Sequence, residues 1–295
     1  MIRVGPAGWT HPGLAPLWPP AATGEGLDPL GLLARYFDVV EADATAHAMP
    51  RPAHVERWRA AISARAGTRL VVRVPSELVD LARPGPERLA GAARFRETLA
   101  PLVRRRRLGA AVAVLDPRAL YGPAETRALA DLARELDGIP LVLEAAHRSW
   151  YASRSLDALS GAGWSLAHLV ADDRWDAPPE RHRPTGPVGM LRVVRSGGIA
   201  PPGIGWLARR ALGLANDVED VYVVTDNGGR AGTAPAASLV AALEIAHVLA
   251  GEQPVPAWKA VLDAYPHLRR VVRIEDPAPM QDRTESGGER RDAQA

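Results

Sequence analysis

The chain has 295 residues, of which 47% are hydrophobic and 24% are charged, and this is sufficient for one large globular domain with a substantial core. Its 36 Lys and Arg residues nearly balance 34 Asp and Glu residues, so the formal net charge is +2 and no nucleic-acid partner is expected. The absence of Cys excludes disulfides, thiolate metal ligands and cysteine nucleophiles. The sequence contains neither a secretory signal nor an apolar run long enough to span a membrane, so we expect a cytoplasmic protein.

Apolar runs typical of buried strands alternate along the chain with segments in which apolar residues recur at helical spacing. After the first strand and a Gly-rich segment, a Pro- and Gly-rich loop leads to Asp28, the expected N-cap of a helix that begins with Pro29. The expected strands are residues 2–4, 39–43, 70–74, 111–116, 141–144, 164–171, 188–194 and 221–225. The expected helices are residues 29–37, 52–62, 86–103, 123–136, 153–159, 202–214 and 235–249.

Eight alternations of strand and helix over about 250 residues are typical of a single (β/α)8 barrel of the TIM type, which we expect for residues 1–275. The alternative α/β fold is a doubly wound open sheet, but no Gly-x-Gly-x-x-Gly motif follows the first strand. Residues 276–295 have little to bury and are expected to form a disordered tail. The Arg run at 104–107 is interpreted as the solvated end of a helix rather than an anion-binding patch.

Ionisable side chains gather at the carboxyl ends of the expected strands, which in a barrel surround one mouth. The period-two alternation of strand side chains predicts that one set of them points inward. This set is Glu41, Asp43, Arg73, Asp116, Glu144, Arg192 and Asp226. Carboxylates that meet in a confined space have raised pKa values, pair with guanidinium groups or hold a cation, and raised pKa values suit acid–base catalysis.

These positions predict catalytic and binding roles. Glu41 and Glu144 are the acid–base candidates, and His147 in the following loop is a candidate proton shuttle. The expected contacts with a small polar or anionic ligand are Trp9, Arg73, Trp150, Arg192, Asp226 and Asn227, with Gly198 and Gly229 as phosphate-binding positions in Gly-rich loops. The sequence has no His-x-x-x-His motif or similar metal signature, and it indicates no cofactor and no oligomeric state.

Each of these interpretations has a structural alternative. The arginines and carboxylates can close the upper layer of the barrel as a network without chemistry, and Asp43, Asp116 and Asp172 can cap the helices that follow them. His147 can be an ordinary surface residue, the Gly-rich loops can be tight turns, and Trp9 and Trp150 can cover the barrel rather than line a pocket. Glu144 needs a partner in any case, because it ends an otherwise apolar strand.

The sequence also resembles the YecE-like family, known as domain of unknown function 72, in order from about residue 3 to residue 250. The matching segments are residues 5–9, 40–45, 143–150 and 221–223, together with Pro50, Trp58, Arg192, Asn227 and Gly229. The Glu, His, Ser and Trp pattern within 143–150 is the most specific part of this resemblance. The resemblance implies a TIM-type barrel with a site at the strand ends, and it implies no particular reaction.

Several positions depart from the family's pattern. That pattern has Thr and Ser at Pro6 and Ala7, Asn at Asp43, Phe and Tyr at Ala46 and His47, Lys at Arg73, Gln at Val114, Arg at Ala146, His at Val194 and Asn at Asp226. The retained residues are Glu41, Thr45, Glu144, His147, Ser149, Trp150, Arg192 and Asn227. Two hypotheses follow: an enzyme acting on a small polar, sugar-like or phosphorylated substrate, and a degenerate barrel that binds a ligand or a protein partner without turnover.

Overall fold

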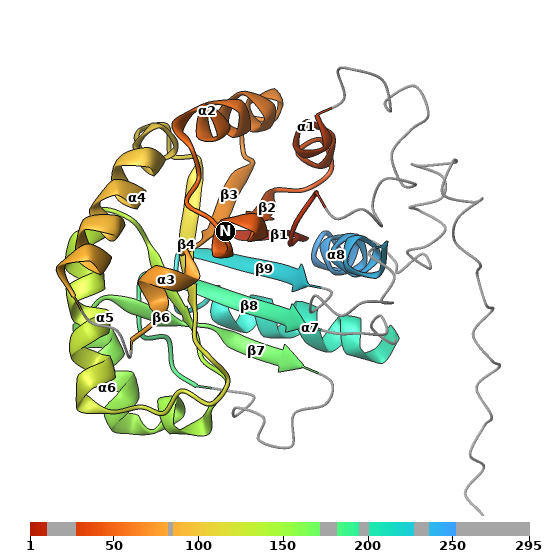
Figure 1. Cartoon of the computed structure of the whole chain (residues 1–295). Helices are drawn as coiled ribbons and strands as arrows, with labels where there is room; N and C mark the ends of the chain where they lie inside the picture. The colour runs from red at the N-terminus through yellow and green to blue at the C-terminus, as the bar shows by residue number, and fades with distance from the viewer. Residues whose placement is uncertain (11–27, 82–84, 172–181, 195–200, 227–235, 252–295) are drawn as a thin grey trace, which may run out of the picture.

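The computed structural model describes residues 1–10, 28–81, 85–171, 182–194, 201–226 and 236–251. Within these ranges, parallel strands occupy the centre of the molecule and helices lie around them (Figure 1). The strands are β1 (Ile2–Pro6), β2 (Val39–Ala42), β3 (Arg69–Arg73), β4 (Leu108–Val114), β5 (Leu141–Glu144), β6 (Trp164–Leu166), β7 (His168–Ala171), β8 (Val188–Val194) and β9 (Asp220–Asp226). The α-helices are α1 (Pro29–Leu33), α2 (Pro52–Ala61), α3 (Ser76–Val79), α4 (Pro86–Arg104), α5 (Pro123–Glu135), α6 (Ser153–Gly161), α7 (Pro201–Leu214) and α8 (Ala236–Leu249), and the 3-10 helices are η3 (Asp43–Ala46), η4 (Ile62–Ala64) and η5 (Arg148–Tyr151).

The strands form two parallel sheets that join into a ring. One sheet has the order β1-β9-β8-β7 and the other has the order β2-β3-β4-β5-β6. The sheets meet where Ala7 bridges to Glu41 and the N–H of Gly8 donates to the Glu41 carbonyl at 2.9 Å. They also meet where the chain passes from β6 into β7 through Ala167, the only residue between these strands. The expected TIM-type α/β fold is therefore confirmed, and the doubly wound open sheet is not adopted.

The expected elements agree closely with those observed. Asp28 caps α1, because its carboxylate accepts a hydrogen bond from the N–H of Leu30 at 3.1 Å. The strand expected at 164–171 is divided, because β6 pairs with β5 whereas β7 pairs with β8. The strand expected at 111–116 lies earlier, at 108–114, since its first residue already pairs with β3. The domain boundary at residue 275 and the tail at 276–295 lie outside the described residues.

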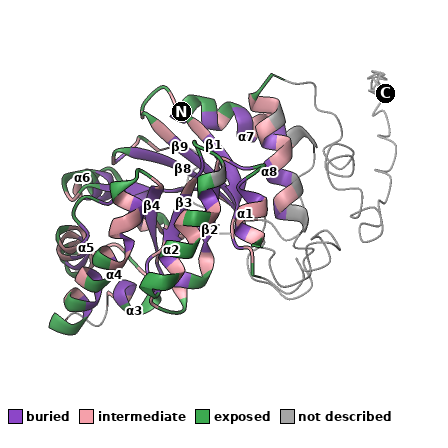
Figure 2. Ribbon diagram, turned by 90° about the horizontal axis from the view of Figure 1, so that it is seen from above, coloured by how far each residue is buried: buried purple, intermediate pink, exposed green. Residues whose placement is uncertain are grey.

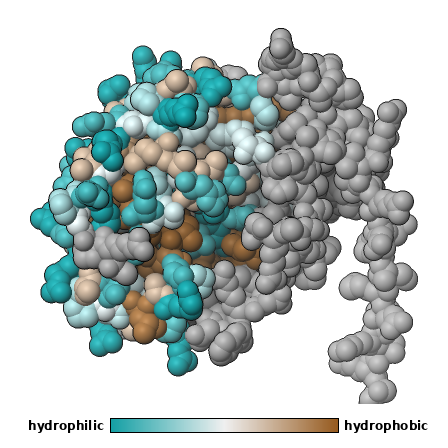
Figure 3. Space-filling model, in the orientation of Figure 1, coloured by the Kyte–Doolittle hydropathy of each residue, from teal (hydrophilic) through white to brown (hydrophobic). Residues whose placement is uncertain are grey.

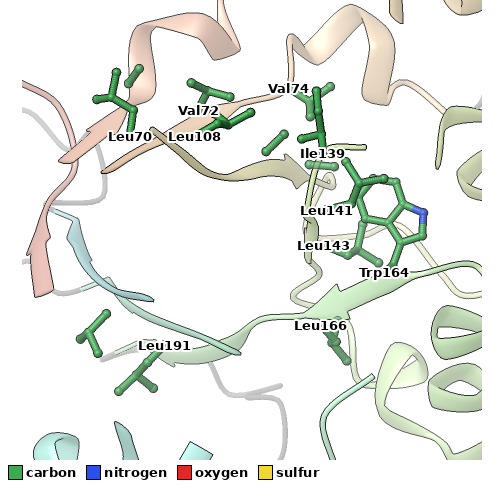
Figure 4. Packing of buried hydrophobic residues seen from close by; sticks show 14 of the residues in the cluster. Leu70, Val72, Val74, Leu108, Ile139, Leu141, Leu143, Trp164, Leu166 and Leu191 are labelled. Carbon is green, nitrogen blue, oxygen red and sulfur yellow. The ribbon is translucent and has the colours of Figure 1, made fainter. Parts of the chain in front are cut away.

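The main hydrophobic core lies between the ring of strands and the helices. Figure 4 shows outward-facing members of this core, including Leu70 and Val72 of β3, Leu141 of β5 and Trp164 of β6. The strands are buried, whereas the helices expose their outer sides (Figure 2). The face seen in Figure 3 is largely hydrophilic, with hydrophobic residues gathered near its centre. No helix in the described ranges combines the length and apolar character needed to cross a membrane.

A second apolar cluster fills the inside of the ring. Its buried members are Val39, Val71, Ala110, Val112, Val142, Ala167, Val188, Met190, Tyr222 and Val224, which come from the inward faces of the strands. Gly109 makes room for the Tyr222 ring, because a Cβ at this position would lie 2.9 Å from it. The middle of the barrel is thus packed with side chains, and a ligand can approach only from its ends.

The amino-terminal end of the barrel is closed by an ionic layer that the sequence did not predict. Arg3 donates to the Asp220 carboxylate, and Arg69 Nη1 donates to Asp220 Oδ2 at 3.0 Å and to the Tyr222 hydroxyl at 3.1 Å. Burial by itself raises the pKa of Asp220, but the bonds and charges of the two arginines hold the pKa below its usual value. We assign this layer a stabilising role, since the active sites of TIM-type barrels lie at the opposite, carboxyl ends of the strands.

Two stacked histidines lie on the outer side of β7. The rings of His168 and His182 are 3.7 Å apart and nearly parallel, at 6°. Arg210 Nη2 lies 2.8 Å from His168 Nδ1, and because a guanidinium group can only donate, Nδ1 accepts and His168 is neutral. Burial, and then the neighbouring His182 and Arg210, lower the pKa of His168 from 6.5 to about 2.

We expect this cluster to destabilise the protein as the pH falls. Unfolded His168 takes up a proton below its ordinary pKa of 6.5 but the folded residue does not, so its contribution is present above pH 6.5 and is lost below it, by up to about 1.4 kcal/mol per pH unit. Urea unfolding at several pH values should give a shallower pH dependence for His168→Gln than for the wild type. His47→Gln, at an exposed position, is the control. Equal slopes for all three proteins would contradict the expectation.

Candidate functional site

Five of the predicted strand-end residues meet at the carboxyl end of the barrel. We call Glu41, Arg73, Glu144, Arg192 and Asp226 the mouth network; they come from β2, β3, β5, β8 and β9. Each shares the inward face of its strand with a residue of the apolar cluster two positions earlier. The alternation of strand side chains is therefore the reason that residues far apart in sequence converge here.

Arg192 is the centre of the mouth network and has no exposed side-chain surface. Its Nε donates to Glu144 Oε2 at 2.9 Å, its Nη2 donates to Glu41 Oε1 at 3.0 Å, and its Nη1 lies 3.8 Å from Asp226 Oδ2. Burial by itself lowers the pKa of Arg192, but the three carboxylates outweigh it and raise the pKa well above its usual value. Arg192 is consequently a permanent cation that links its own strand, β8, to β2, β5 and β9.

Arg73 pairs with two of the same carboxylates, those of Glu41 and Asp226. Its Nε donates to Glu41 Oε1 at 2.7 Å, and its Nη2 donates to Asp226. Glu41 has no exposed side-chain surface, whereas the side chains of Arg73, Asp226 and Glu144 are 20%, 18% and 13% exposed. The guanidinium groups expected to clamp an anionic ligand are thus already paired with the chain's own carboxylates.

Asp43 lies beside the mouth network at the start of η3. Burial is the largest cause of its raised pKa; Arg73 lowers the pKa, and the charges of Glu41 and Asp226 raise it further. The carboxylate packs against Gly8, whose φ of +76° and missing Cβ allow the approach, because a Cβ there would lie 2.6 Å from Asp43 Oδ2. Asp43 therefore holds a proton more readily than an ordinary exposed aspartate does.

His147, Ser149 and Trp150 connect the loops that follow β4 and β5. His147 Nδ1 accepts from the Ser149 N–H at 3.1 Å and lies 2.9 Å from Ser149 Oγ, which in turn accepts from the N–H of Tyr121 at 2.8 Å. Trp150 is fully buried in the main core, and its Nε1 donates to the Ala119 carbonyl at 2.9 Å. The indole of Trp150 is thus part of the main core between the strands and the helices.

The remaining predicted residues include one that lies apart from the network and several that the structure does not describe. Asp116 is exposed and binds the backbone and side chain of Arg118, so the expectation that it converges with the others is wrong; β4 ends at Val114, and the chain has turned outward. Trp9 is half-buried and packs edge-on against Trp58 at 5.9 Å. Four further predicted positions, Asp172, Gly198, Asn227 and Gly229, lie outside the described residues.

Apolar side chains complete the mouth, although none of them was predicted to lie there. Val114 of β4, Leu169 of β7 and Val194 of β8 are half-buried at the same height as the mouth network. The alternation of strand side chains could have predicted two of them. Because Val112 and Arg192 point inward, Val114 and Val194, two positions further along the same strands, also point inward. In the parts of the chain that the structure describes, no group of three or more His, Asp and Glu residues is arranged to hold a metal ion.

The model of the family described as "Protein of unknown function DUF72" matches residues 3–260. The chain belongs to the DUF72 family. A crystal structure of a DUF72 family protein from Enterococcus faecalis V583 has a TM-score of 0.68 at 18% identity, covering 85% of this chain and 96% of that chain. One from Thermotoga maritima MSB8 has a TM-score of 0.66 at 16% identity, covering 85% and 99%. No curated protein matches this DUF72 chain.

These likenesses establish the fold of the DUF72 chain, and the resemblance expected from the sequence is confirmed. Thr45, one of the retained residues, shows how this DUF72 barrel fixes its mouth. Its Oγ1 lies 2.7 Å from the carbonyls of Ala42 and Arg73 and accepts from the N–H of Arg73 at 2.9 Å. The turn after β2 is thereby fastened to the end of β3, and the Arg73 guanidinium is held in place.

Proposed function

We propose that the mouth of the barrel binds a small hydroxyl-rich molecule, such as a sugar or another polyol, with the mouth network as its rigid floor. The partial exposure of Arg73, Glu144 and Asp226 supports this proposal, because these side chains keep polar atoms accessible above a barrel that is filled lower down. Hydrogen bonds to fixed polar groups orient a small ligand, and half-buried apolar neighbours supply contact area.

One unused donor carries the proposal. Arg192 Nη1 is buried and has no hydrogen-bond partner in the described residues, and Asp226 Oδ2 at 3.8 Å is too distant to be one. A buried donor without a partner costs about 1–3 kcal/mol. A hydroxyl group accepts from Nη1 and donates to a carboxylate at once, which neither a pure donor nor a pure acceptor can do.

Acid–base catalysis on the bound molecule is a second candidate function, and the raised pKa of Asp43 favours it. Glu41 is sealed between Arg73 and Arg192, so Asp43 and Glu144 replace it as the carboxyl groups for proton transfer in this proposal. His147 stays a candidate proton shuttle in this proposal, and its Nδ1 accepts from the N–H of Ser149.

Ligand-induced stabilisation tests the binding proposal. We expect neutral sugars or polyols to raise the melting temperature of the wild type in a saturable manner, as binding to the folded state requires. Val114→Phe should abolish the shift, because the larger ring fills the mouth. Leu212→Phe, on an α7 residue that is 50% exposed, should leave the shift unchanged. A shift that persists in Val114→Phe, or no shift with any polyol, would contradict the proposal.

Turnover is measured separately on the ligands that bind. If the second candidate function holds, NMR of the incubated ligand shows conversion by the wild type, and Glu144→Gln and Asp43→Asn lose conversion while the thermal shift remains. Ligand that stays unchanged with the wild type, together with a normal thermal shift, indicates a binding barrel without turnover.

A further inference from the structure

Within the described ranges, the side chains at the mouth carry an excess of negative charge. Glu41, Glu144, Asp226 and the adjacent Asp43 contribute four carboxylates, whereas Arg73 and Arg192 contribute two guanidinium groups. With every group ionised, the formal charge of these six described side chains is −2. Such a site repels an incoming phosphate or carboxylate group and attracts a cation.

The excess charge lies on one side of the ring. β9 ends in Asp226 and β3 ends in Arg73. Glu41 is the penultimate residue of β2, and Asp43 directly follows that strand. On the opposite side of the ring, β4, β7 and β8 present Val114, Leu169 and Val194 to the mouth. A ligand that fits both sides has a polar, positively charged edge and an apolar face.

Two buried atoms indicate that the charged side of the mouth binds a ligand, in addition to the pairing of its own carboxylates with its own arginines. Arg192 Nη1 and Glu41 Oε2 make no hydrogen bond within the described ranges, although both side chains are completely buried. Glu41 Oε2 is only 2.7 Å from Arg192 Nη2, but this contact lacks hydrogen-bond geometry. The network therefore retains both donor and acceptor capacity.

We infer that the mouth selects a hydroxylated amine, in which a protonated amino group stands beside the hydroxyl groups, and that it discriminates against phosphate esters. This inference rests on the proposed binding of a hydroxyl-rich molecule and adds the sign of its charge. The amine lies on the side of Asp43 and Asp226, and the C–H face of the ligand packs against Val114 and Val194. A cation in this position also relieves the repulsion among carboxylates that contributes to the raised pKa of Asp43.

Matched ligands that differ in one group test the inference. Calorimetric titrations of the full chain with glucose, glucosamine and glucose 6-phosphate, and with glycerol, 2-amino-1,3-propanediol and glycerol 3-phosphate, compare neutral, cationic and anionic forms of two skeletons. We expect the amine of a binding series to bind about tenfold more tightly than its neutral form and the phosphate to bind more weakly than the neutral form. The preference for the amine should shrink as salt is added, because exposed charges are screened.

Charge-removing variants test whether the preference for the amine comes from carboxylates at the mouth. Asp43→Asn, and Asp43→Asn combined with Asp226→Asn, remove one and two negative charges while keeping the side-chain size, so the ratio of amine to neutral affinity should fall stepwise toward one. Asp116→Asn removes the same charge from the exposed turn after β4 and should leave the ratio unchanged. Circular dichroism and melting temperature verify that each variant is folded.

The outcomes separate this inference from the proposed function. Binding of the neutral forms with equal affinity for the amine, or with tighter binding of the phosphate, would overturn the charge selectivity and leave the binding site in place. A preference for the amine that persists in the double variant would also overturn it. Failure of all six compounds to bind would overturn both proposals.

Discussion

Arg192→Met is expected to lower the free energy of unfolding by about 3–5 kcal/mol, the usual cost of removing one partner from a buried ionic network. The Met side chain occupies a similar volume but leaves Glu144 without the guanidinium that bonds it, and Glu41 with Arg73 alone. Urea unfolding at neutral pH measures this loss.

The pH dependence of the free energy of unfolding checks that result. The difference between Arg192→Met and the wild type should narrow as the pH falls through the carboxyl range, because protonated carboxyl groups need no countercharge. Arg118→Met removes an arginine whose side chain is 92% exposed and is expected to change stability by less than about 0.5 kcal/mol. If Arg192→Met were as stable as Arg118→Met, the mouth network would not stabilise the barrel.

Gly5→Ala is expected to be equally damaging, with a loss of more than about 3 kcal/mol or failure to fold. A Cβ on Gly5 would lie 1.7 Å from the carbonyl oxygen of Val39, a backbone atom that cannot move unless β1 and β2 separate. The melting temperature and the yield of soluble protein measure the effect.

Gly67→Ala is the matched control for this substitution. No atom lies within 4 Å of a Cβ at Gly67, so its replacement should leave the melting temperature close to that of the wild type. A fully stable Gly5→Ala protein would show that the two sheets do not need close contact at this point.

The sequence predicted the fold and the convergence of five strand-end side chains because both depend on local periodicity. Inward alternation from Val71 leads to Arg73, and alternation from Val224 leads to Asp226, without knowledge of the partner strands. Asp116 was misplaced because the same rule was extended beyond the point where β4 ends. Strand boundaries are set by pairing with neighbours, which a single sequence does not contain.

The ion-pair partners and the burial of these side chains could not be predicted from the sequence. An Arg at the end of a strand can bind a ligand or pair with carboxylates of its own chain. For Arg192 the choice depends on distances across the barrel, which the sequence does not contain. Trp150 was equally ambiguous, because an indole after a strand suits both a pocket wall and a core. The ionic layer of Arg3, Arg69 and Asp220 was not predicted, because these residues lie at the starts of their strands and pair only across the barrel.

The span of the mouth network along the chain has a consequence for assembly. Its bonds join residues 151 and 153 positions apart, as in Arg192 with Glu41 and Arg73 with Asp226. Contacts with such large separations close the longest loops and form after local structure. The network is complete only when β2, β3, β5, β8 and β9 are all in place, so we expect a nascent or truncated chain to lack the site altogether. Ligand capture at the mouth is accordingly a readout of whether the whole ring has formed.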